Sequence, residues 1–427
     1  MPKDLSIYIH IPFCKTICLY CNFVTFAHKN KKIPQYVEAV VRELESRANK
    51  YGERPVETVY FGGGTPSLIA PHHIEQIFST IKERFSLNPD AEINIECNPE
   101  SLDEEKIEKY QASGITRISL GIQSFSKKTL LRIARPHDDK TIIRALAAIK
   151  NTGFKNFGAD FIIGLPYQTL ESFSAEIEKI LTYEPPHLSV YFLSYDTKRI
   201  DLFIKDSPDE ETQIRMYEFL TARLKKEGYN HYEVSNYAKP GFESRHNMRY
   251  WEQKEYIGVG VGAHSYADGK IWENGSDFEE YLKEPLQERE ETEINGDLER
   301  MDSIMLNLRT FRGINKREYE SRFTDHAELM KKAEPYIESG HLKFSGNSLH
   351  ATEKGYLILD RITRDLLGVF HPFPKGGIKP VRRLALKFFV IARDVAGKVR
   401  LLFFGVPGAG KHIENKNRQK NELARVQ

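Results

Sequence analysis

The sequence predicts an α/β fold, a partial (β/α)6 TIM-like barrel followed by a small winged-helix-like α+β domain. Over residues 1 to about 230, short apolar segments rich in β-formers alternate with longer segments of helical periodicity. After residue 290 the pattern changes to helical segments around one short strand-turn-strand feature. Repeated βα units pair their strands in parallel and place functional residues at the carboxyl ends of the strands. A doubly wound open sheet is the alternative for the first part.

The composition is that of a soluble protein of two or three domains. The chain has 427 residues, of which 40% are hydrophobic and 29% charged, so it can bury a large core. These values exclude disordered, collagen-like and disulfide-scaffold classes. Every apolar run is shorter than the roughly 18 residues of a membrane-spanning helix, and the first residues do not resemble a signal peptide. We therefore expect a cytoplasmic protein.

Six βα units imply a parallel sheet that closes at least in part into a barrel. The helical segments between the strands include residues 35–50, 73–85 and 140–152. A further amphipathic helix is expected over 210–227, and a strand begins at His231. The six predicted strands begin at Leu5, Glu57, Glu92, Arg117, Phe157 and Leu188.

Four segments follow from these patterns. We expect the barrel over 1–235, a connecting segment over 236–290 and the α+β domain over 291–367. Residues 368–427 carry thirteen basic and three acidic side chains, a net charge of +10 against −8 for the rest of the chain. We expect a solvated or disordered extension there, with peripheral membrane contact as the alternative and no binding of nucleic acid.

Three of the four cysteines lie within eight residues, directly after the first predicted strand. They are Cys14, Cys18 and Cys21, whereas Cys97 lies far away in an apolar stretch. Such clustering favours a metal site over a disulfide, and thiolates select iron–sulfur clusters, zinc or copper(I). A closed zinc site needs a fourth ligand, for which His10 is the nearest candidate. Three thiolates fit a [4Fe-4S] cluster with one open iron better, and zinc stays the alternative.

The C-x3-C-x2-C motif after a first strand, with Tyr20 before the last cysteine, resembles the radical S-adenosylmethionine (SAM) enzymes. The resemblance implies that Cys14, Cys18 and Cys21 bind a [4Fe-4S] cluster whose open iron is chelated by the amino and carboxylate groups of SAM. It also implies the partial barrel of that superfamily. Reductive cleavage of SAM there gives a 5′-deoxyadenosyl radical, while the protein orients the cofactor and excludes water.

A glycine run ends the second predicted strand, in YFGGGTP from Tyr60. Consecutive glycines let a ligand approach the backbone closely and present unhindered N–H groups. Alone, such a run is more often a tight turn. It lies one βα unit after the cysteines, where the radical SAM enzymes keep their glycine-rich contact with the SAM amino group.

Further SAM contacts are implied by resemblance to the branch of the superfamily that acts on porphyrins. Glu96 would accept a hydrogen bond from the SAM ammonium group, and Arg135 would pair with its carboxylate. Gln123 and Asp160 would bind ribose hydroxyls or adenine. All four lie at or just beyond the ends of predicted strands, so they converge on one face. The SAM-binding residues implied in this way are Tyr8, Tyr20, Gly63, Gly64, Thr65, Glu96, Gln123, Arg135 and Asp160.

Residues 1–367 resemble the HemN/HemW family along their whole length. The HemN branch, the oxygen-independent coproporphyrinogen III dehydrogenases, has a further cysteine two residues after the third and a long N-terminal segment. This chain has Phe23 at that position, and about four residues precede its first strand. Both departures disfavour coproporphyrinogen dehydrogenase activity, which stays the alternative function.

The hexapeptide HNMRYW, from His246, matches the HNxxYW motif that is associated with heme in the HemW branch. A neutral imidazole is a common iron ligand, Tyr250 and Trp251 offer flat surfaces for a porphyrin, and Asn247 would orient the imidazole. Without the resemblance, an aromatic packing turn with an incidental histidine is the alternative. The resemblance implies a chaperone that binds heme at His246 and passes it to heme-requiring, respiratory proteins.

Overall fold

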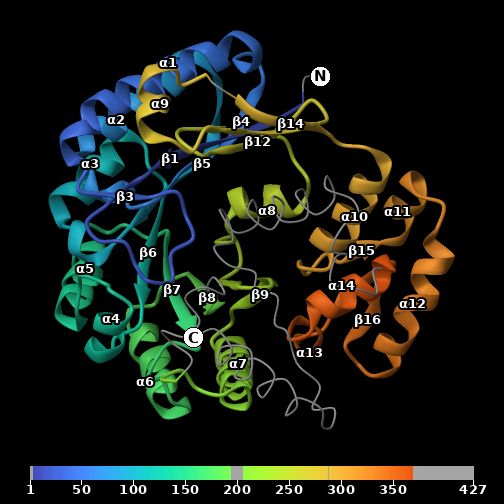
Figure 1. The fold of residues 1–427 in the computed structure, drawn as a ribbon. Helices are drawn as coiled ribbons and strands as arrows, with labels where there is room; N and C mark the ends of the chain where they lie inside the picture. Colours follow the sequence, from blue (N-terminus) through green and yellow to red (C-terminus); the bar gives the residue numbers. More distant parts are fainter. Residues whose placement is uncertain (1–2, 194–204, 287, 369–427) are drawn as a thin grey trace, which may run out of the picture.

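The computed structural model describes residues 3–193, 205–286 and 288–368 (Figure 1). The basic extension lies outside this described part from residue 369 onward, and so does its expected membrane contact. Within the described part, no helix combines the length and the apolar character needed to cross a membrane.

The six predicted strands form the centre of a twelve-stranded sheet. They lie in sequence order, and each pairs in parallel with the next. This order confirms the barrel type of winding, because a doubly wound sheet reverses its strand order at a switch point. The sheet is not closed into a full barrel. The strands are β1 (Leu5–Ile11), β4 (Pro55–Gly63), β5 (Ser86–Cys97), β6 (Arg117–Gln123), β7 (Phe157–Ile163) and β8 (His187–Phe192).

Helices cover the outer side of this sheet (Figure 1). The longer helices turn an apolar stripe toward the strands; in α1, for example, Val37, Val40 and Leu44 are buried at helical spacing. Side-chain caps fix several of their starts, such as Asp138, which accepts from the N–H of Thr141. The helices are α1 (Ile33–Tyr51), α2 (Pro71–Arg84), α3 (Glu104–Ser113), α4 (Lys127–Arg132), α5 (Asp139–Asn151), α6 (Leu170–Leu181) and α7 (Glu210–Lys226).

The segment from His231 to residue 293 extends the sheet at both edges. The single strand expected from His231 is wrong in detail, because a turn splits it into two short antiparallel strands, β9 (Asn230–Glu233) and β10 (Asn236–Ala238). On the opposite edge, Tyr256 pairs in parallel with Ser6 of β1, and three antiparallel strands follow. The added elements are α8 (Arg245–Trp251), β11 (Tyr256–Val259), β12 (His264–Ala267), β13 (Lys270–Asn274), α9 (Phe278–Lys283) and β14 (Glu288–Glu293).

The C-terminal part is a small α+β unit with its own apolar core. Its three-stranded antiparallel sheet has the order β15-β17-β16. The last two of these strands are the predicted strand-turn-strand. The elements are α10 (Gly296–Asn307), β15 (Ile314–Asn315), α11 (Lys316–Arg322), α12 (His326–Glu338), β16 (Leu342–Ser345), β17 (Ser348–Ala351), α13 (Glu353–Tyr356) and α14 (Leu359–Leu367).

Helix α8, which carries the HNMRYW hexapeptide, lies inside the curve of the sheet (Figure 1). Its side chains and N-terminus bond to Asp4, which precedes β1, to Thr58 in the first half of β4, and to Glu92 in the middle of β5. Arg249 contacts Asp4 at 3.1 Å, His246 contacts Thr58 at 2.6 Å, and Glu92 accepts from the first turn of the helix. The helix therefore forms a floor at the end of the barrel opposite to the carboxyl ends of the strands.

Candidate cofactor site

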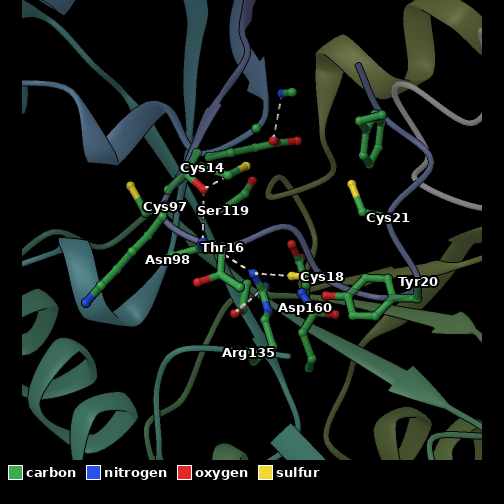
Figure 2. A pocket seen from close by; sticks show the side chains of 18 of the residues that line it. Cys14, Thr16, Cys18, Tyr20, Cys21, Cys97, Asn98, Ser119, Arg135 and Asp160 are labelled. Carbon is green, nitrogen blue, oxygen red and sulfur yellow. Dashed lines mark hydrogen bonds between the residues drawn. The ribbon is translucent and has the colours of Figure 1, made fainter. Parts of the chain in front are cut away.

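A cavity lies at the carboxyl ends of the central strands (Figure 2). The loop after β1, the glycine run of β4, the end of β5, residues along β6 to β8 and helix α8 all contribute to its wall. Eleven of the thirteen predicted site residues line it, and Tyr8 and His246 are the two that do not. The eleven are Cys14, Cys18, Tyr20, Cys21, Gly63, Gly64, Thr65, Glu96, Gln123, Arg135 and Asp160.

All three cysteines line the cavity (Figure 2). The Oγ1 atom of Thr65 lies 3.7 Å from the sulfur of Cys14, and Nη1 of Arg135 lies 3.8 Å from the sulfur of Cys18. Burial raises the pKa of the Cys14 thiol to about 12. A buried thiol of this kind becomes a thiolate when a metal cation supplies the compensating charge.

A closed zinc site needs a fourth protein ligand beside the three cysteines. The candidate fourth zinc ligand, His10, instead has one ring nitrogen 2.8 Å from the carbonyl of Val24 and the other 3.0 Å from the hydroxyl of Tyr8.

The glycine run is packed against the strand that leads into the cysteine loop. The N–H of Gly64 donates to the carbonyl of Ile11 at 2.8 Å, and a Cβ on Gly64 would lie 2.8 Å from the carbonyl oxygen of Phe13. Gly63 has a φ of +110°, which favours glycine. The sequence therefore needs glycine here to bring β4 against the cysteine loop.

Glu96 presents its carboxylate to the cavity from the end of β5. One oxygen accepts from the hydroxyl of Tyr60 at 2.8 Å, and the other accepts from the N–H of Gly63 at 3.1 Å. Burial and the adjacent Glu96 carboxylate raise the pKa of Tyr60 well above its usual value, so Tyr60 stays a hydrogen-bond donor. An acidic group held in this way can bind an ammonium group.

Arg135 and Gln123 leave buried polar atoms in the cavity wall. The guanidinium of Arg135 donates to the carbonyl of Gly121 at 3.0 Å and to Oδ1 of Asn98 at 3.2 Å. Its Nε atom and Oε1 of Gln123 are buried without a hydrogen-bond partner in the described part of the chain. Buried polar atoms rarely stay unpaired, so a ligand with complementary groups fits this wall.

Gln123 ends β6 in a strained conformation. Its φ is +68°, and the pairing register with β7 shifts between Gly121 and Gln123. Non-glycine residues adopt such angles where the surrounding structure holds them, often at functional sites. His137 contributes to this support, with one ring nitrogen 3.2 Å from the carbonyl of Ile122 and the other 3.0 Å from Glu100.

Several lining residues were not identified from the sequence. In β6, Ser119 and Gly121 alternate with the predicted Gln123, and in β8 Ser189 and Tyr191 have the same spacing. Side chains two residues apart in a strand point to the same face. Polar residues at this spacing inside buried strands are the signal that would have located them. Asn98, Glu100 and Asn247 also line the cavity, and they follow no such spacing.

Tyr8 lies one layer behind the cavity wall. Its ring is stacked on that of Tyr60 with centroids 6.1 Å apart, and its hydroxyl lies 3.0 Å from Nδ1 of His10. Tyr60 lines the cavity and separates Tyr8 from it.

His246 also lies behind this wall. Its side chain is 0% exposed, its Nδ1 lies 2.6 Å from the hydroxyl of Thr58, and its Nε2 lies 2.9 Å from the hydroxyl of Tyr250. The imidazole is stacked on Tyr60 at 4.9 Å. Burial lowers the pKa of His246 well below its usual value, so the ring is neutral and both nitrogens are engaged. The next residue, Asn247, lines the cavity instead.

Two parts of the chain match known family models. Residues 8–180 match the family model described as the Radical SAM superfamily, and residues 300–358 match that of the HemN C-terminal domain. The first match contains the cysteines, the glycine run and Asp160. The solved structure of coproporphyrinogen III oxidase (HemN) from Escherichia coli, a radical SAM enzyme, has a TM-score of 0.75 and 24% identity. The match covers 86% of this chain and 90% of that chain, and it shows the fold.

Curated relatives match over most of their length. The heme chaperone HemW of Lactococcus lactis subsp. lactis (strain IL1403) is 33% identical over 365 residues, which are 83% of this chain and 95% of that protein. The heme chaperone HemW of Escherichia coli (strain K12) is 36% identical over 275 residues, which are 62% of this chain and 72% of that protein. The chain belongs to the HemW family of heme chaperones.

Proposed function

We propose that the protein is a heme chaperone that binds heme and delivers it to heme-requiring proteins. The observation that carries this proposal is the match to HemW relatives, one of which the chain covers over 95% of its length. A radical SAM cavity in the same chain, lined by the cysteines and the predicted SAM residues, supports a [4Fe-4S] cluster and SAM as its cofactors. The alternative, coproporphyrinogen dehydrogenase activity, is disfavoured because Phe23 lines the cavity where that branch has a cysteine.

We propose that Cys14, Cys18 and Cys21 hold the cluster. When bound, the cluster supplies one-electron chemistry at an iron that lacks a protein ligand. Arg135 and Thr65 are the nearby donors that stabilise the thiolate charge of Cys18 and Cys14.

The remaining cavity residues are proposed to hold SAM. The carboxylate of Glu96 binds the ammonium group, and Arg135 binds the carboxylate, with its unpaired Nε as the added donor. Gln123 and Asp160 bind the nucleoside part. Tyr8 acts from behind the wall by supporting Tyr60. The residues that border the bound molecule are Tyr20, Gly63, Gly64 and Thr65.

We propose that His246 is the heme contact. Its neutral imidazole has the protonation state that iron ligation requires. In this conformation Nε2 of His246 is hydrogen-bonded to the hydroxyl of Tyr250. Heme binding at His246 therefore requires that this hydrogen bond breaks so that Nε2 can bind the iron. It also requires that the structure opens beside α8 to admit the heme.

The test compares three proteins by heme titration, with iron and sulfide content measured on each. His246→Ala is expected to weaken heme binding roughly tenfold or more, because an iron–imidazole bond is lost, and to leave cluster content unchanged. Tyr250→Phe is the matched control, since it frees Nε2 of His246 and is expected to retain or increase heme affinity. Equal heme affinity of wild type and His246→Ala would remove His246 from the heme site.

We further propose that the acceptors are respiratory proteins and that residues 369–427 contact anionic membranes. The net charge of +10 over residues 368–427 supports the second proposal. Flotation of the full chain and of a chain ending at residue 368 with anionic vesicles tests it. Equal flotation of the two would end the proposal.

A further inference from the structure

Helix α8 is held rigidly at its N-terminus by a buried carboxylate. Glu92 of β5 accepts from the N–H of His246 at 3.0 Å and from the N–H of Arg245 at 3.2 Å. Ser244 caps the same turn by accepting from the N–H of Asn247. These bonds fix the rotation of the helix about its axis, and so the direction of each side chain that follows.

Successive side chains of a helix point about 100° apart, because one turn takes 3.6 residues. His246 points into the core against Thr58 and Tyr250, so Asn247 points elsewhere. Asn247 lines the cofactor cavity, together with Ser119, Asp160 and Ser189 from the central strands. Asn247 is thus the residue of the hexapeptide that faces the cavity.

The amide oxygen of Asn247 lacks a partner among the described residues. Oδ1 is inaccessible and makes no hydrogen bond to the protein, although the side chain is only 6% exposed. Leaving a buried acceptor unpaired costs stability, and such a cost is offset when a ligand supplies the missing donor. The atom therefore points to a hydrogen-bond donor on the molecule that fills the cavity.

The position of Asn247 indicates which part of that molecule it meets. The cysteines lie on the loop after β1, whereas α8 lies at the opposite end of the barrel. Asn247 lines the cavity together with Asp160, which is proposed above to bind the nucleoside part of SAM. Ribose hydroxyls and the adenine amino group are donors, and Oδ1 is an acceptor. We infer that Asn247 is a SAM-binding residue that accepts a hydrogen bond from the nucleoside part, an inference that rests on the SAM site proposed above.

The experiment measures SAM affinity on the full chain, reconstituted with its cluster under anaerobic conditions. Asn247→Leu removes the acceptor with little change in size and is expected to weaken SAM binding roughly tenfold. Asn247→Asp keeps an acceptor at the same place and is expected to retain most of the affinity. Met248→Leu is the matched control on the same helix, because Met248 packs in a separate apolar cluster.

A second readout separates ligand binding from a merely structural role. Removing an unpaired buried acceptor does not cost a hydrogen bond within the protein, so Asn247→Leu is expected to unfold in denaturant at the wild-type midpoint or above it. Wild-type SAM affinity in Asn247→Leu, or an equal loss of affinity in Met248→Leu, would overturn the inference. Failure of the cluster-loaded wild type to bind SAM would instead overturn the SAM site itself.

Discussion

At the scale of single residues, the close contact between the glycine run and the cysteine loop decides whether the cavity forms. A Cβ on Gly64 would lie 2.8 to 2.9 Å from backbone atoms of Ile11, Pro12 and Phe13. Backbone atoms cannot rotate away as a side chain does, so any larger residue pushes β4 and the cysteine loop apart.

Gly64→Ala is expected to lower the free energy of unfolding by about 1–3 kcal/mol and to reduce both cluster content and SAM affinity. Denaturant unfolding, iron content and SAM titration measure the three effects. Gly296→Ala is the control, because a Cβ there meets no atom of the described residues within 4 Å. Wild-type iron content and SAM affinity in Gly64→Ala would contradict the assigned role of this contact.

The structure brings the residues of the cysteine motif and of the glycine run into one cavity. The cysteines lie within eight residues and the glycines are consecutive, so both motifs can be recognised in the sequence alone. His246 was also found by its motif, but its surroundings come from Thr58, Tyr60 and Tyr250. The sequence did not indicate that these three side chains enclose the imidazole, because two of them belong to a strand about 190 residues earlier.

At the scale of elements, helix α8 depends on a contact distant in sequence. It has seven residues, too few for an isolated helix to persist in water. Glu92 supplies a negative charge at its positive N-terminal end and lies 3.9 Å from the buried guanidinium of Arg117. The helix therefore forms only where β5 and β6 bring these charges together.

Glu92→Gln is expected to lower the free energy of unfolding by about 1–3 kcal/mol, because charged hydrogen bonds to the first turn of α8 become neutral ones and Arg117 loses its counter-charge. The buried Trp251 of α8 reports local loosening by a red shift in fluorescence.

Glu57→Gln is the control, since its ion pair with Arg245 is at the surface and contributes little. Equal unfolding midpoints and spectra for the two variants would contradict the account of α8.

Elements were predicted where they are long and strongly periodic. All six central strands and the helices around residues 35–50 and 210–227 were identified. The strands β11 to β13 escaped prediction because four or five residues are too few to show a period of two. Their place in the sheet comes from the pairing of β11 with β1, which is separated from it by about 250 residues.

At the scale of the whole molecule, the barrel and the C-terminal domain meet beside β9. Glu233 and Thr310 form an isolated antiparallel β-bridge. On either side of it, the N–H of Val234 donates to the carbonyl of Arg309, and the N–H of Phe311 donates to the carbonyl of Tyr232. Glu233 is 0% exposed, and burial raises its pKa to about 8. The junction of the two domains is therefore built around a carboxyl group that is protonated at neutral pH.

This carboxyl group makes stability depend on pH. Between its usual pKa of 4.5 and about 8, the unfolded chain releases a proton that the folded chain keeps, so the free energy of unfolding falls as the pH rises. Glu233→Gln lacks this titrating proton. Its free energy of unfolding is therefore expected to rise relative to that of the wild type by up to about 1.4 kcal/mol for each unit of increase in pH.

Denaturant unfolding of both proteins at about pH 5.5 and about pH 8 measures the difference, and other titrating groups cancel because both proteins share them. A pH-independent difference between the two proteins would show that Glu233 is ionised in the folded state.

Heme titration of the anaerobically reconstituted full chain, followed by absorbance, tests the central proposal most directly. We predict saturable heme binding by a protein that carries its cluster and does not convert coproporphyrinogen III when SAM and a reductant are added. Failure to bind heme, together with turnover of coproporphyrinogen III to protoporphyrinogen, would contradict the proposal.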